Sequence, residues 1–110
     1  MSKTLNFNQI KKQYFTVTLP NDEATTLMIC TPTKAIMGEF ISMQNNLSTD
    51  SMGTGAIDEL YSLCAKIMSR NKGGIKITVD KLVKILDFED IIVFIRGYTD
   101  FISEVTNSKN

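Results

Sequence analysis

The sequence predicts an α+β domain in which an N-terminal β-hairpin is followed by a bundle of three to four α-helices. Three observations lead to this fold class. Apolar and polar residues alternate early in the chain, whereas apolar residues recur every three or four positions later. The strand-like and helix-like segments are also segregated along the chain, which argues against a doubly wound sheet. The length of 110 residues and the 43% apolar content fit a single domain over 1–110.

The hairpin is predicted over about 13–30. Apolar residues alternate with threonines over 15–19, which is typical of a half-buried strand. Proline, asparagine and aspartate over 20–23 favour a turn, and 25–30 is again rich in strand-forming residues. A shorter alternation over 4–8 predicts a third strand.

The first helix is predicted over 33–47, because apolar residues recur at helical spacing from Ile36 to Leu47. Thr33 is the expected N-cap. Small polar residues and glycine then predict a loop over 48–55. Two interpretations of this loop stay open, a solvated connector or a partner contact.

Two further helices are predicted over 56–72 and 79–86. The first has acidic residues in its first turn and basic residues in its last turn, as the helix dipole favours. It is expected to end at Gly73 and Gly74, since glycine readily adopts the left-handed C-cap conformation. Thr78 is the expected N-cap of the second.

The last helix is predicted over 88–105, with Asp87 as its N-cap. It is apolar around most of its circumference, so we expect it either at the centre of the core or covered by a second chain. Arg96 is the exception. It could pair with Asp100 one turn later, or anchor a carboxylate of a partner.

The sequence predicts a non-catalytic protein without a metal or cofactor. It contains no histidine, which removes the commonest catalytic base and a common zinc ligand. Cys30 and Cys64 lie in apolar runs and form no CxxC motif, so we expect core thiols. The acids at Asp87, Glu89 and Asp90 fit a helix start better than a cation site.

The N-terminal region shows no signal-peptide pattern, and the longest apolar run, over 91–95, has five residues. A bilayer-spanning helix needs roughly 20 apolar residues. We therefore expect no membrane segment, and a cytoplasmic protein.

Charge is balanced overall, with 12 basic and 12 acidic residues, but it is unevenly distributed. Six basic residues and one acidic residue lie over 66–84, and five acidic residues and one basic residue over 87–104. Such opposite patches suit self-association or a charged partner, although solvated helix faces would give a similar pattern. Zero net charge and the lack of interleaved aromatics argue against nucleic-acid binding.

Several segments carry a resemblance to a known family. They are TPTKAI at 31–36, DELYSLCAKIMSRNKGG at 58–74, ITV at 77–79, and LDFEDI through YTDFI over 86–102. Together these resemble the tail assembly chaperones of phages and prophages of Gram-positive bacteria. The resemblance implies a protein, often multimeric, that binds and shields the long helical tape measure protein in the bacterial host cytoplasm.

We expect the partner-binding surface on the last helix and on the basic stretch before it. The candidate residues are Phe94, Arg96, Tyr98 and Phe101, with Lys66, Arg70 and Lys72. Two alternatives remain open from the sequence. One is a structural or completion component of the phage tail, and the other is a small regulatory or nucleic-acid-binding module that uses the basic stretch 66–84.

Overall fold

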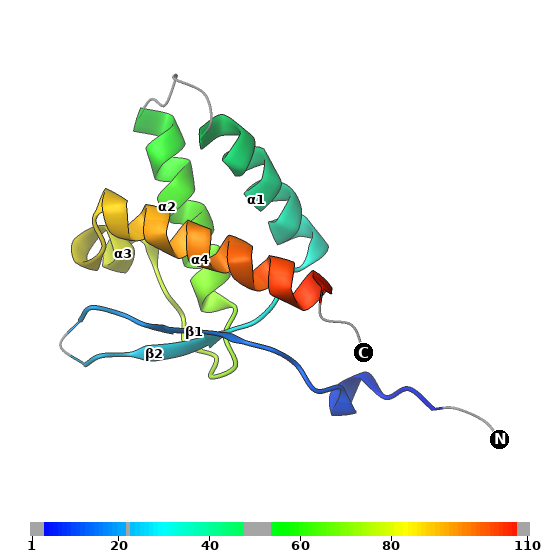
Figure 1. Cartoon of the computed structure of the whole chain (residues 1–110). Helices are drawn as coiled ribbons and strands as arrows, with labels where there is room; N and C mark the ends of the chain where they lie inside the picture. The colour runs from blue at the N-terminus through cyan, green and yellow to red at the C-terminus, as the bar shows by residue number, and fades with distance from the viewer. Residues whose placement is uncertain (1–3, 22, 48–53, 108–110) are drawn as a thin grey trace.

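The structure, a computed structural model, describes residues 4–21, 23–47 and 54–107 and confirms the predicted α+β fold. Helices α1 and α2 lie side by side, and α4 crosses them (Figure 1). The hairpin lies at the end of the molecule away from the connection between α1 and α2 (Figure 1). The elements in chain order are η1 (Phe7–Gln9), β1 (Phe15–Thr18), β2 (Thr26–Ile29), α1 (Lys34–Leu47), α2 (Thr54–Ser69), α3 (Val79–Ile85) and α4 (Phe88–Asn107).

The hairpin has the predicted alternation. β1 and β2 are antiparallel, with Val17 opposite Leu27 and Thr18 opposite Thr26. The side chains of Phe15, Val17, Leu27 and Ile29 pack against the core. Met28 and the threonines lie on the outer face, where the hydroxyls of Thr18 and Thr26 are 3.2 Å apart. The two-residue period thus gives the sheet one core face and one solvent face.

The second helix, α2, ends earlier than the sequence predicts. The prediction extends it to Lys72, but α2 stops at Ser69. The reason is backbone pairing with β2: the N–H of Cys30 donates to the carbonyl of Arg70 at 2.8 Å, and the N–H of Lys72 donates to the carbonyl of Met28 at 2.9 Å. These long-range bonds replace the hydrogen bonds that another helical turn would have made.

Asn71, rather than the glycine pair, organises the turn after α2. Its side-chain amide donates to the carbonyls of Met68 at 2.8 Å and Ile75 at 2.7 Å, and its Oδ1 accepts from the N–H of Ile75 at 2.9 Å. Gly74 does have the left-handed conformation, with φ of 70°. It lies in this turn and not at the helix end, so the predicted C-cap at Gly73 and Gly74 is wrong.

All three predicted N-caps are confirmed. The Oγ1 atoms of Thr33 and Thr78 each accept a backbone N–H from three residues later, at 3.3 and 3.2 Å. Asp87 accepts the N–H of Asp90 at 2.8 Å, and the Asp90 carboxylate accepts the N–H of Asp87 at 3.1 Å. This reciprocal pair is a capping box, with aspartate in place of the usual glutamate.

The start of α2 and the end of α4 each differ from the predicted boundary by two residues. Residues 48–53 of the predicted loop lie outside the described residues, and its last two, Thr54 and Gly55, belong to α2. α4 continues past 105 to Asn107, and the hydroxyl of Thr106 donates to the carbonyl of Ile102 at 2.9 Å in this added turn.

The predicted strand over 4–8 is wrong. Residues 4–13, here called the N-terminal arm, are all exposed and contain only the short helix η1. The side chain of Asn6 caps η1 by accepting the N–H of Asn8 at 2.9 Å. The arm extends away from the helices (Figure 1).

Tyr98 of α4 lies at the centre of an aromatic core. Its side chain is fully buried, and its hydroxyl donates to the carbonyl of Cys30 at 3.1 Å. The ring of Phe15 lies 5.7–6.1 Å from the rings of Phe94, Tyr98 and Phe101, and Phe40 of α1 meets Tyr98 edge-on at 5.6 Å. Such rings stabilise the core through both buried area and ring geometry.

Candidate functional site

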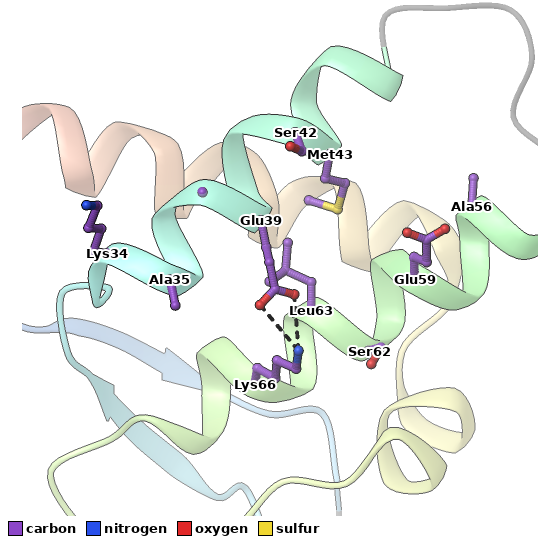
Figure 2. Close-up of a pocket in the computed structure, with 11 residues that line it drawn as sticks. Lys34, Ala35, Glu39, Ser42, Met43, Ala56, Glu59, Ser62, Leu63 and Lys66 are labelled. Atoms are coloured by element: carbon purple, nitrogen blue, oxygen red, sulfur yellow. Dashed lines mark hydrogen bonds and ion pairs between the residues drawn. The ribbon is translucent and has the colours of Figure 1, made fainter.

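A groove of about 980 Å³ lies between α1 and α2. Figure 2 shows side chains of both helices along it. We call it the α1–α2 groove. It is lined by Lys34, Ala35, Gly38, Glu39, Ser42 and Met43 of α1 and by Ala56, Glu59, Ser62, Leu63 and Lys66 of α2.

Small residues create the groove. Ala35, Gly38 and Ser42 are spaced by three and four positions and therefore share one face of α1. A Cβ atom added at Gly38 would meet nothing within 4 Å, so the space above it is open. Met43 and Leu63 are buried and form the apolar floor.

An ion pair crosses the groove. The ammonium group of Lys66 lies 3.1 Å and 3.3 Å from the two carboxylate oxygens of Glu39 (Figure 2). Both side chains are about half exposed, so solvent screens the pair and it contributes at most about 1 kcal/mol. Lys34 and Glu59 also line the groove, and the ion pairs of the described residues do not include either of them.

The groove has the features of a helix-binding site. It combines an apolar floor, small residues that allow close backbone approach, and charged side chains at its rim. A helix with side chains is about 10–12 Å wide and can place one apolar stripe into such a groove. The arrangement therefore supports binding of an amphipathic helix.

The aromatic residues expected to contact a partner lie in the core. Phe94, Tyr98 and Phe101 are buried against Phe15, so they do not form a surface. Burial raises the pKa of Tyr98 to about 12. The sequence predicts them on an interface because α4 is apolar on several faces. In the structure they pack against Phe15, which β1 positions beside α4.

Arg96 is the one exposed member of the predicted set on α4. The ion pairs of the described residues do not include Arg96 and Asp100, so the predicted pairing is absent there. An arginine N-terminal to an aspartate at this spacing has the less favourable orientation. Arg96 therefore projects from α4 without that partner.

The three predicted basic residues each connect two parts of the fold. Lys66 forms the ion pair across the groove. The guanidinium Nε of Arg70 donates to the carbonyl of Thr31 at 2.7 Å, and the ammonium group of Lys72 lies 5.5 Å from the ring centroid of Tyr14. Of the seven predicted residues, only Lys66 lines the α1–α2 groove.

Sequence reasoning missed the residues that shape the groove. Ala35, Gly38 and Ser42 lie on the face of the first helix that points away from its apolar stripe. They are spaced by three and four positions, as the apolar residues of the stripe are. A run of small residues on a predicted helix face permits close approach of a second helix. The spacing of these small residues is therefore the sequence signal that indicates the groove.

The part of the chain that the structure describes holds neither a metal-binding cluster nor a membrane-spanning helix. Among these residues, no group of three or more His, Cys, Asp or Glu side chains is placed to hold a metal ion. None of the described helices combines the length and apolarity that crossing a membrane requires. Comparisons with protein-family models, with curated proteins and with solved structures find no match to this chain.

Proposed function

We propose that the protein is a non-catalytic tail assembly chaperone of a phage or prophage, which binds the tape measure protein in the bacterial host cytoplasm. Two things support the proposal. The segments 31–36, 58–74 and 86–102 resemble that family. The α1–α2 groove has the shape and lining that an amphipathic helix requires.

The groove is the observation on which the proposal mainly depends. An apolar stripe of the tape measure helix would contact Met43 and Leu63, and the small residues near Gly38 would let its backbone approach α1. Covering an apolar stripe removes it from water, and this is how a chaperone would keep a long helical partner soluble. The charges of Lys34 and Glu59 would favour one direction of the bound helix.

The intramolecular contacts of the basic stretch weigh against the nucleic-acid alternative. Lys66, Arg70 and Lys72 each contact another part of this chain. Phosphate binding would have to compete with those contacts for the same cations. We therefore propose a protein partner for this chain and no nucleic acid.

The test is binding of purified full-length protein to helical segments of the tape measure protein from the same phage, measured by calorimetry. Gly38→Leu fills the groove and should weaken binding by at least about tenfold. Ser103→Leu places the same side chain on an exposed position of α4 and should leave the affinity unchanged. Thermal unfolding of both variants checks that each is folded.

The outcomes are distinct. No binding by the wild-type protein, or equal affinities of the two variants, would overturn the proposal. Mass spectrometry of purified virions separates the remaining alternative, because a structural or completion component of the tail stays in the particle and a chaperone does not.

A further inference from the structure

A second cavity, of about 430 Å³, lies between β1 and α4. We call it the β1–α4 cavity. Residues 15–20 form one wall, and Asp90, Val93 and Phe94 of α4 form part of the other. Its volume lies in the range of roughly 300–1,000 Å³ that is typical of ligand pockets. It is on a different part of the molecule from the α1–α2 groove.

The outer edge of β1 borders this cavity and carries no further strand among the described residues. The N–H of Leu19 donates to the carbonyl of Thr25, the residue just before β2. In the same register, residues 15 and 17 form their backbone hydrogen bonds with β2. In an antiparallel pair the intervening residues face outward. Thr16 and Thr18 therefore present backbone donors and acceptors at the outer edge.

Over its four residues this edge carries no protective side chain, and Pro20 follows two positions after the strand ends. β1 has the sequence FTVT, with neither a charge nor a proline. Natural edge strands often carry such residues because an unprotected edge pairs with other chains. β2 does not have this exposure, because residues 70–72 pair with its other side.

The N-terminal arm has the features of a strand that could add to this edge. Leu5 is 69% exposed and Phe7 is 72% exposed, and these two apolar residues are separated by one polar residue. In an extended chain they would point to the same side, as the alternation along a strand requires. η1, which contains Phe7, spans only three residues, so extending it disrupts little structure.

The charges of the N-terminal arm also favour its binding beside the β1–α4 cavity. The arm contains two basic residues, Lys11 and Lys12, and no acidic residue. The first turn of α4 beside the cavity carries Glu89 and Asp90. Opposite charges on the two surfaces favour their encounter and fix the orientation in which they meet.

We propose that the N-terminal arm of a second copy of this chain adds as a strand to the outer edge of β1, with Leu5 and Phe7 in the β1–α4 cavity. The occupant is a second copy because the arm extends away from its own molecule (Figure 1). Strand addition supplies main-chain hydrogen bonds, and the cavity receives alternate side chains. The inference does not depend on tape measure binding.

The first test is the mass of the full-length protein, measured by light scattering over a dilution series. The wild type should exceed the 12.3 kDa of one chain. Leu5→Ser with Phe7→Ser should weaken association by at least about tenfold. Both side chains are largely exposed, so this double variant should stay folded. A wild type that is monomeric at every concentration, or an unaffected double variant, would overturn the proposal.

A second test locates the receiving surface. Val93 lines the cavity and is 63% exposed, whereas Val83 on α3 is 60% exposed and does not line it. Val93→Lys should weaken association as strongly as the arm variant, and the matched Val83→Lys should leave it unchanged. Equal effects of the two substitutions would contradict the assigned edge.

A third measurement tests the direct contact. A fluorescent peptide with the sequence of residues 4–12 is titrated into the full-length double variant, whose own arm lacks both apolar side chains. The peptide should bind, and adding Val93→Lys should abolish binding. No tape measure protein is present in these assays, so their failure leaves the proposed function untouched, and Gly38→Leu should not alter self-association.

Discussion

The ring of Phe15 approaches α4 at Gly97, where its Cζ atom would lie 2.8 Å from a Cβ atom added to that glycine. Real Cβ atoms do not make contacts this short. The glycine thus lets β1 dock closely on α4 and places Phe15 among the rings of Phe94 and Phe101. This contact packs β1 against α4, in addition to the backbone hydrogen bonds between β2 and the residues after α2.

Gly97→Ala should lower the free energy of unfolding by about 1 kcal/mol. Overpacking against Phe15 costs about 1–3 kcal/mol, and the better helix propensity of alanine returns up to about 1 kcal/mol. Gly38→Ala on α1, which has open space around it, should instead stabilise by about 0.5–1 kcal/mol. Urea unfolding measures both, and a Gly97→Ala protein more stable than the wild type would contradict the tight contact.

Tyr98→Phe should destabilise the fold by about 1–3 kcal/mol, because the carbonyl of Cys30 loses its hydrogen-bond donor. The ring itself is retained, so the aromatic packing is preserved. Denaturant unfolding near neutral pH measures the effect. A change below a few tenths of a kcal/mol would show that the hydroxyl contributes little.

Stability should fall in alkaline solution. Burial raises the pKa of Tyr98 from 10.0 to about 12, so between these pH values the unfolded chain loses a proton that the folded protein keeps. The Tyr98 contribution is therefore fully present below pH 10.0 and decreases as pH rises toward 12, with a slope of at most about 1.4 kcal/mol per pH unit for one proton. Tyr98→Phe should have a shallower decline over this interval. Identical slopes would argue against the shifted pKa.

The two cysteines should differ in reactivity. Burial raises the pKa of the Cys64 thiol to about 12, and its side chain is inaccessible, whereas Cys30 is only half buried. Since the thiolate is the reactive form, iodoacetamide at pH 8 should modify Cys30 well before Cys64. Denaturant should equalise the two rates. Peptide mass spectrometry assigns each site, and rapid labelling of Cys64 in the folded protein would contradict its burial.

Local features of the fold could be predicted from the sequence. Thr33, Thr78 and Asp87 cap the helices as expected, because capping depends only on residues three positions apart. The alternation at Val17 and its neighbours likewise places one face of the hairpin on the core, because a strand has a fixed period.

Features that depend on distant residues could not be predicted. α2 ends at Ser69 because residues 70–72 pair with β2, about 40 positions away in the chain. Phe94 and Phe101 face Phe15 rather than solvent, and the apolar pattern of α4 does not specify which face meets β1. The α1–α2 groove also depends on how two separate helices pack together. Of the residues that line it, the sequence predicts only Lys66 as a partner-binding residue.

The most direct test of the central claim is an NMR titration of isotope-labelled full-length protein with a helical tape measure segment. The proposal predicts chemical-shift changes concentrated at the α1–α2 groove, including the amides of Ala35, Gly38 and Ser62. Shifts concentrated instead on the exposed lysines Lys76 and Lys84 of the basic stretch, or no shifts at all, would contradict it.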